Sequence, residues 1–295
     1  MTAYSLDQLN ALNEADFTAA LGGIFEHSPW VAQAASAKRP FATLAALLEA
    51  MTAAVRAAPA DVQLKLIKAH PDLAGKAARA GAMTADSVSE QGSVGLDRLN
   101  DAEYTRFQRL NDGYQGKFGI PFIICVRRHT KDSILSEFER RLAQDKGDAV
   151  ETALGEIFRI AALRLDSQVT APQRLPLHGR LSTHVLDTHG GLPGAHVPVE
   201  LWELSRDGDA RLLLRAVTNQ DGRTDKPLIA ERPVPIGTYE LRFAVAAYFK
   251  TRGVTLAEPP FLDVVPIRFS VAEPEAHYHV PLVTTPWSYS TYRGS

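Results

Sequence analysis

The sequence predicts two domains, an all-α domain followed by an all-β domain of the sandwich or barrel class. At 295 residues the chain is longer than the usual single domain. Proline usage divides it, because residues 1–166 contain five prolines and residues 167–295 contain thirteen. Proline breaks helix interiors, so we expect helices in the first part and none in the second. The spacing of apolar residues changes at the same place, from three or four to two.

The first part is rich in Ala, Leu, Glu and Arg, which favour helices. Asp16 and Asp61 are placed to cap the starts of two helices, and Asp101 starts a third. Apolar residues at helical spacing predict further helices within residues 41–51, 134–142 and 151–165. Several helices with short connections are typical of a bundle-like all-α domain, which we place at residues 1–167.

Residues 168–177 are expected to form a linker, because their prolines forbid a helix and stiffen the segment. Beyond it, short alternating runs are separated by turn signals such as Asp221-Gly222-Arg223. The runs predict strands at residues 181–187, 197–204, 212–218, 237–245, 267–271 and 278–283. Many short strands indicate a β-sandwich or barrel over residues 178–295. The fold class is therefore multidomain, α and β.

Composition excludes several classes of function. The chain has 32 Lys and Arg against 34 Asp and Glu, a net charge of −2, which favours neither nucleic acid nor an anionic membrane as a partner. Cys125 is the only cysteine, so no intramolecular disulfide can form, and we expect a cytoplasmic protein. We expect no signal peptide and no membrane span, because no apolar run of sufficient length occurs.

The β part contains an unusual group of polar residues. His184 lies within a predicted strand, Arg223 follows an Asp-Gly turn, and His277 and His279 share one face of a strand. Strand histidines are commonly solvated or hydrogen-bonded side chains. Paired histidines are also a metal-ligand pattern, although no carboxylate or cysteine accompanies these. The sequence contains no Gly-x-Ser-x-Gly motif, so nothing in it indicates a serine hydrolase.

The last ten residues are aromatic and hydroxyl-rich, unlike a disordered tail. Together with "LSTHVLDTHGGLPG" and "TNQDGRTD", the ending "HYHVPLVTTPWSYSTYRGS" resembles the 5-hydroxyisourate hydrolase family of transthyretin-related enzymes over residues 178–295. The resemblance implies a transthyretin-like β-sandwich, a tetramer formed through this domain, and no metal. It also implies a site whose catalytic residues are His184, Arg223, His279 and Ser295, with Tyr292, Arg293 and Gly294 binding substrate. His277 is expected outside the first layer of contacts.

In the α part, Pro71 ends a helix directly after His70. The imidazole is therefore expected at a helix C-terminus, where the dipole favours the imidazolium form of a proton donor, although a plain capping histidine would occupy the same place. Arg164 lies on the apolar last helix. Unless its side chain reaches the surface, a buried arginine there requires an anion.

Five segments, "FEHSPWVA", "HPDLAGK", "SVSEQGSVGLDRLN", "KFGIPFIICVR" and "ALRL", resemble the 2-oxo-4-hydroxy-4-carboxy-5-ureidoimidazoline (OHCU) decarboxylase family over residues 4–167. Val94 is a mild departure, since Ala is more usual there. The resemblance implies an all-α fold, cofactor-free decarboxylation to S-allantoin and dimer contacts through this domain. It makes His70 the proton donor, with Glu90 nearby to orient or charge it. The substrate-binding residues that it implies are Pro71, Ser87, Gln91, Phe122, Ile123, Ile124, Cys125, Val126 and Arg164.

The two resembled families catalyse consecutive steps of urate degradation, so each resemblance supports the other. We therefore expect a homo-oligomeric enzyme acting on small molecules, with no cofactor, nucleic acid or membrane as partner. Two alternatives remain at this point. One is a transthyretin-like binding protein with a helical interaction domain, and the other is a metal-dependent cyclic amidohydrolase.

Overall fold

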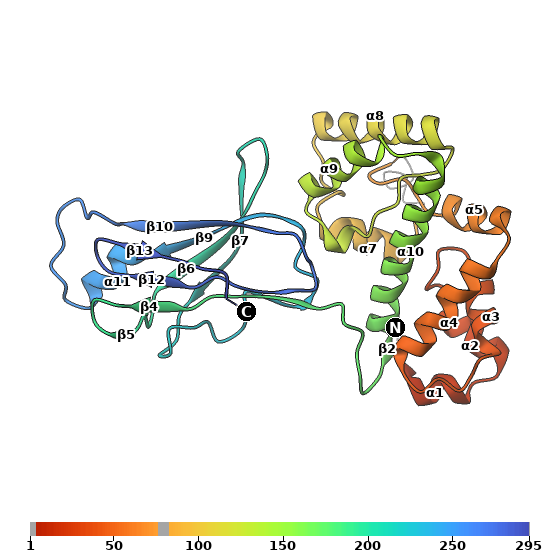
Figure 1. The fold of residues 1–295 in the computed structure, drawn as a ribbon, viewed down its shortest axis with the longest axis horizontal. Coiled ribbons are helices and arrows are strands. Elements are labelled where there is room, and N and C mark those ends of the chain that lie inside the picture. Colours follow the sequence, from red (N-terminus) through yellow and green to blue (C-terminus); the bar gives the residue numbers. More distant parts are fainter. Residues whose placement is uncertain (1–3, 76–82, 295) are drawn as a thin grey trace. The chain divides into compact units, whose positions relative to one another are not determined.

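The computed structural model describes residues 4–75 and 83–294, and the chain divides into two compact units. The first unit comprises residues 1–127 and 133–176 and is mainly helical, whereas the second comprises residues 128–132 and 177–295 and is mainly β (Figure 1). This is the predicted fold class. No pattern in the sequence indicates that the short segment 128–132 groups with the second unit.

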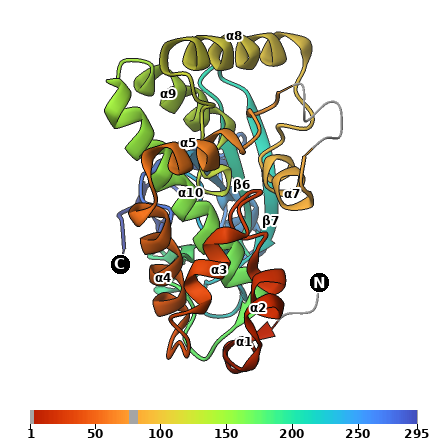
Figure 2. The same ribbon diagram turned by 90° about the vertical axis from the view of Figure 1, so that its right-hand side faces the viewer.

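The helical unit contains helices of six to 23 residues. They are α1 (Leu6–Ala11), α2 (Glu14–Leu21), α3 (Trp30–Ser36), α4 (Leu44–Ala57), α5 (Ala60–Lys68), α7 (Ala85–Ser93), α8 (Asp101–Phe118), α9 (Lys131–Arg141) and α10 (Lys146–Gln168). Within this unit, α8 and α9 lie at one end and α1 at the other, with α10 running between them (Figure 2). A short parallel pair, β1 (Tyr4–Ser5) and β2 (Val169–Thr170), joins the two ends of its chain.

Helix boundaries follow local capping, but not always at the predicted residue. α8 begins at Asp101 as expected, because Asn100 and Glu103 form a reciprocal capping box. The prediction of Asp16 as a cap was wrong, since Asn13 caps α2 and Asp16 lies in its first turn. Pro59 stands at the N-cap of α5, which places Asp61 in its first turn. Acidic residues near a helix start are stabilised by the dipole without capping, which is why the two roles look alike in sequence.

α10 is the central helix of the first unit, and it is longer than the predicted 151–165. Its residues from Ile160 to Asp166 are all buried, including the charged Arg164 and Asp166. A helix with buried charge needs partners for it. The residues that supply them to Arg164 define the site described below.

The second unit consists of antiparallel and parallel strand pairs in three sheets. Their strand orders are β10-β9-β6-β7, β11-β3-β8 and β13-β12-β4-β5. The strands are β3 (Gly179–Ser182), β4 (Val185–Asp187), β5 (Leu192–Pro193), β6 (Pro198–Leu204), β7 (Ala210–Val217), β8 (Ile229–Arg232), β9 (Gly237–Ala244), β10 (Val264–Val271), β11 (His277–His279), β12 (Leu282–Thr284) and β13 (Tyr289–Ser290). A core of Val, Leu, Ile, Phe and Tyr side chains fills this unit.

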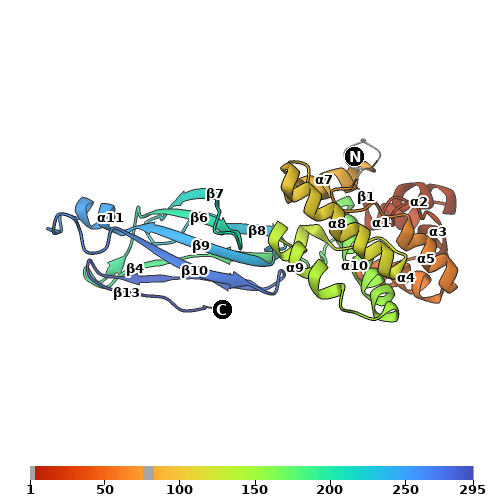
Figure 3. The ribbon, with the colours of Figure 1, turned by 90° about the horizontal axis from the view of Figure 1, so that it is seen from above.

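The second unit also contains a helix, α11 (Val245–Thr251), so the expectation of no helix there was wrong. Its seven residues contain no proline and follow β9 directly, and α11 lies at one end of the sheets (Figure 3). The strand β8 was not predicted. No helix in the described part of the chain is long and apolar enough to cross a membrane.

Candidate active sites

The helical unit contains a pocket of about 370 Å³. It is lined by His70, Pro71, Leu73, Ser87, Glu90, Gln91, Phe122, Ile123, Ile124, Val126, Ile160 and Arg164. These come from α7, α10, the segment after α5 and the segment after α8. The structure thus brings together every residue predicted for this site except Cys125. Leu73 and Ile160 were not predicted, and their side chains extend the apolar wall of the pocket.

His70 lies just beyond the end of α5 and is 8% exposed. Its Nδ1 is 3.0 Å from the carbonyl oxygen of Leu66. A carbonyl only accepts hydrogen bonds, so Nδ1 carries the hydrogen and Nε2 of the neutral ring is unprotonated. Burial lowers the pKa of His70 to about 4, although the Leu66 hydrogen bond and the charge of Glu26 act in the opposite direction. The expectation that this helix end would favour the imidazolium was wrong, because burial outweighs both the Leu66 hydrogen bond and the charge of Glu26.

The chain after His70 is held by side-chain amides. Ala74 has a left-handed φ of 50°, which is unfavourable for a residue with a Cβ. Its N–H donates to Oε1 of Gln91 at 2.9 Å, and Nδ2 of Asn111 donates to the Leu73 carbonyl at 2.8 Å. Gln91 therefore lines the pocket and also fixes the turn that follows His70.

Arg164 is the centre of a buried ionic cluster. Its Nε and one Nη donate to the two carboxylate oxygens of Glu90, each at 2.9 Å, and its other Nη donates to Glu26 at 2.7 Å. Burial acts to lower the pKa of Arg164, but the hydrogen bonds and charges of Glu90 and Glu26 outweigh it and raise the pKa. The anion expected opposite this arginine is thus supplied by the protein itself. Glu90 is bound to Arg164, and Glu26 is the carboxylate whose charge acts on His70.

Glu26 is a site residue that the sequence reasoning missed, although it stands in the "FEHSPWVA" segment. It is 2% exposed and accepts hydrogen bonds from the hydroxyls of Thr84 at 2.7 Å and Ser87 at 3.1 Å. Burial acts to raise its pKa, but the Thr84 hydrogen bond and Arg164 lower it overall. Glu26 is therefore a charged carboxylate held in a fixed position beside the pocket. The available signal was an acidic residue directly after Ile24 and Phe25, within a segment that carries the family resemblance.

In the β unit, His184 and His279 lie together, with ring centroids 6.4 Å apart. His184 sits in the break between β3 and β4, where it pairs with Arg223 across a β-bridge, and His279 ends β11. Position 222, next to His184, requires glycine, because its φ is 72° and a Cβ there would lie 2.4 Å from the Val185 carbonyl oxygen. The predicted continuous strand 181–187 is interrupted at Thr183 and His184, between β3 and β4.

Ser182 links the two histidines of β11. Its hydroxyl lies 2.9 Å from His277 Nε2 and 2.9 Å from His279 Nδ1. His279 thus has Nε2 left for other partners, and His277 stands behind it as expected. Burial, followed by the charge of Arg223, lowers the pKa of both His184 and His279, so both are neutral near pH 7. In the described residues, no three His, Cys, Asp or Glu side chains are grouped to hold a metal ion.

The C-terminal tail returns to the same histidine. Gly294 N–H donates to the His279 carbonyl oxygen at 2.9 Å, and a β-bridge joins the two residues. The Arg293 guanidinium lies 4.7 Å from the centroid of the Tyr278 ring. Tyr292 and Arg223 are exposed. Ser295 lies outside the described residues, as does Lys76 of the "HPDLAGK" segment.

Comparison with known proteins agrees with this division. Residues 10–166 match the model of the OHCU decarboxylase family, and residues 181–294 match that of the HIUase/transthyretin family. A 5-hydroxyisourate hydrolase from Halalkalibacterium halodurans is 52% identical over 119 residues, which are 40% of this chain and 100% of that protein. The chain belongs to both families.

Further relatives support each family domain. A 2-oxo-4-hydroxy-4-carboxy-5-ureidoimidazoline decarboxylase from Haloferax volcanii is 42% identical over 165 residues, covering 56% of this chain and 96% of that protein. The crystal structure of an (S)-allantoin synthase matches with a TM-score of 0.53 and 35% identity, covering 99% of this chain and 100% of that one. Both family resemblances seen in the sequence are thereby confirmed.

Proposed function

We propose that the chain is a bifunctional enzyme that converts 5-hydroxyisourate to S-allantoin. The HIUase/transthyretin domain opens the ring of 5-hydroxyisourate by hydrolysis, and the OHCU decarboxylase domain then removes CO₂ stereospecifically. The observation that carries the proposal is the gathering of each family's residues into a site of its own: His70, Glu90 and Arg164 around one pocket, and His184 beside His279.

Decarboxylation of OHCU leaves a carbanion that the adjacent imine and carbonyl can delocalise. The enzyme must orient the carboxylate, stabilise the charge that develops and deliver a proton to one face. His70 is placed to deliver it, but Nε2 of the free enzyme is unprotonated. With Glu26 and Glu90 against one arginine, the cluster already carries an excess negative charge. An anionic substrate adds another, which raises the pKa of His70 and lets Nε2 take up the proton that it later transfers.

The other groups of this pocket bind and orient. Arg164 is held by two carboxylates, so its guanidinium is fixed in direction when the substrate enters. Ser87 and Gln91 add polar contacts, and Pro71 and the backbone of residues 122–126 form the wall. No step requires a cofactor, because the substrate itself delocalises the carbanion.

Ring opening needs a base to activate water and a donor for the oxyanion that develops. His184 and His279 are the neutral bases available, and Arg223 can present its planar fork to the carbonyls of the substrate. Tyr292 to Ser295 would close over the ring. His184 Nε2 is a buried nitrogen without a hydrogen-bond partner among the described residues, which suits a group that awaits water or substrate.

The proposal includes a homo-oligomer, a tetramer through the transthyretin-like domain with dimer contacts through the helical domain. Trp287, Tyr289 and Tyr292 are each about half exposed near the end of the chain, where a second copy would bury them. A cytoplasmic location also belongs to the proposal, since a single cysteine allows no intramolecular disulfide.

The test generates 5-hydroxyisourate in place with urate oxidase and follows ultraviolet absorbance and circular dichroism. We expect His184→Ala to slow the first absorbance phase and His70→Ala to abolish the enantiomeric excess of allantoin, each without affecting the other step. An unchanged first phase in His184→Ala would refute the hydrolase site. An intact chiral signal in His70→Ala would refute the decarboxylase site.

A further inference from the structure

Part of the wall of the pocket in the helical unit is made by an irregular segment. Phe122, Ile123, Ile124 and Val126 line the pocket, and residues 121–125 belong to no helix or strand. The whole segment is buried. Buried backbone groups outside secondary structure need other partners. Two charged side chains that do not line the pocket provide partners for two of these groups.

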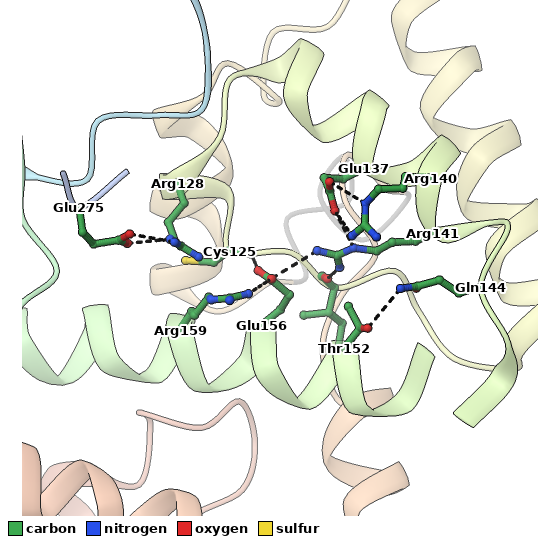
Figure 4. Close-up of polar contacts among 11 residues, drawn as sticks. Cys125, Arg128, Glu137, Arg140, Arg141, Gln144, Thr152, Glu156, Arg159 and Glu275 are labelled. Atoms are coloured by element: carbon green, nitrogen blue, oxygen red, sulfur yellow. Dashed lines mark hydrogen bonds and ion pairs between the residues drawn. The ribbon is translucent and has the colours of Figure 1, made fainter. Parts of the chain in front are cut away.

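Arg141 of α9 and Glu156 of α10 hold the segment at two points (Figure 4). An Nη of Arg141 donates to the Ile123 carbonyl at 2.7 Å, and Cys125 N–H donates to Oε2 of Glu156 at 2.8 Å. The two side chains pair with each other at 3.3 Å and are only 4% and 3% exposed. The predicted residue Cys125 therefore acts through its backbone, and it faces Glu156 instead of lining the pocket.

These two anchors set the direction of the peptide groups of Ile124. The oxygen of Ile123 and the N–H of Ile124 belong to one trans peptide, so they point in opposite directions. The same holds for the Cys125 N–H and the Ile124 oxygen. With Ile123 O on Arg141 and Cys125 N–H on Glu156, Ile124 turns one donor and one acceptor away from the anchors. Ile124 is among the residues that line the pocket, whereas Arg141 and Glu156 are not.

Stability alone does not explain a buried pair of this kind. Replacing a buried ion pair by apolar residues of similar volume is often neutral or stabilising, because desolvating two charges is costly. Here the arrangement is also braced from outside. Glu137 accepts from Nε of Arg141 at 3.0 Å, Arg159 pairs with Glu156, and the Arg141 guanidinium lies 5.1 Å from the centre of the Phe122 ring. Charged hydrogen bonds to backbone are strong and directional, which suits fixing a geometry.

We propose that Arg141 and Glu156 are positioning residues for decarboxylation, which fix Ile124 so that its N–H and C=O bind the ureido or imidazoline amide groups of the substrate. The inference rests on the decarboxylase function proposed above. These amide groups carry both donors and acceptors, so they match the pair that Ile124 presents. Loosening the anchors frees both peptide planes to turn, and a misplacement of about 1 Å at an active site can cost about 100-fold in rate.

The test is the double variant Arg141→Met/Glu156→Leu, which replaces both charges by apolar groups of similar size. We expect it to fold, with kcat/KM for decarboxylation at least about tenfold lower, mainly through KM, and with faster hydrogen exchange at the amides of residues 123–125. Ring opening by the other domain should not change. Arg140→Ala is the matched control, because Arg140 lies on the same helix, pairs with Glu137 and is exposed. It should retain wild-type kinetics.

A folded double variant with wild-type kcat and KM would overturn the proposal, whatever its melting temperature. If the double variant does not fold, Glu156→Gln replaces it. Its amide oxygen still accepts from Cys125 N–H, so we expect KM within about threefold of wild type, whereas the single variant Glu156→Leu loses that acceptor and should raise KM about tenfold. Equal KM values in Glu156→Gln and Glu156→Leu would overturn the proposal. A wild-type chain that opens the ring but never decarboxylates would refute the proposed function instead.

Discussion

Replacing Gly294 by alanine tests how closely the C-terminal tail approaches the hydrolase site. A Cβ on Gly294 would lie 2.7 Å from Cδ2 of His279, whereas carbon atoms pack favourably at about 3.5–4.0 Å. The Gly294 N–H is bonded to the His279 carbonyl oxygen, so the tail cannot retreat without losing that hydrogen bond. The imidazole must move by about 1 Å. Because Cδ2 is bonded to Nε2, the nitrogen left for catalysis moves with it.

A displacement of that size predicts a fall of about 10- to 100-fold in kcat/KM for ring opening. The tail is at the surface, so the melting temperature should change little. The assay is the first absorbance phase with substrate made by urate oxidase, and the chiral signal from the second phase is the internal control for the helical domain. Ser290→Ala is the matched control, because its exposed side chain lies on the same tail. Wild-type ring opening by Gly294→Ala would refute the reasoning.

Three further predictions concern stability and charge. The pKa of His70 in the folded protein, about 4, lies below its ordinary value of 6.5. Between these pH values the unfolded state binds more protons than the folded state. The free energy of unfolding therefore falls as the pH drops through this window, by up to roughly 3 kcal/mol. Urea unfolding followed at 222 nm should show a shallower pH dependence for His70→Asn, and an equal one would contradict this. Glu26→Gln removes one of two charges facing buried Arg164. We expect the free energy of unfolding of the helical domain to fall by about 2–3 kcal/mol and decarboxylation to be at least tenfold slower, as measured by thermal unfolding and steady-state kinetics. Wild-type values in both measurements would contradict this prediction. Asp187→Ala removes the acceptor of the Tyr248 hydroxyl and of two turn N–H groups. Calorimetry should therefore find the β domain less stable by about 2–4 kcal/mol, with decarboxylation unchanged. An unshifted unfolding transition would contradict this prediction.

The division into an α and a β domain was predictable because its signals are local. Proline placement and apolar spacing act over a few residues, and they located the change near residue 170. The same reasoning failed at α11, where a seven-residue helix without proline lies within a proline-rich region. It also failed at Asp16, because Asn13 and Asp16 are both acceptable caps, and in the structure the Asn13 side chain accepts from the Asp16 N–H.

Most of the residues of the two sites could be named from sequence, but not their electrostatic state. The resemblance to two families identified His70, Arg164, His184 and His279. It did not identify Glu26 as a site residue, although Glu26, in the turn after α2, meets Arg164 across 138 residues of chain. It also gave no reason to expect that burial would make His70 neutral.

The sequence by itself determined the fold class, the two family memberships and the identity of most side chains that line the pocket of the helical unit. These follow from composition, periodicity and ordered motifs, which need no knowledge of distant contacts. Only the tertiary structure decided which carboxylates face Arg164, which side chains anchor Ile123 and Cys125, and how near Gly294 comes to His279. The physical reason is that pKa values, buried ion pairs and steric limits depend on distances of a few ångströms between residues far apart in the chain, and local sequence patterns do not encode those distances.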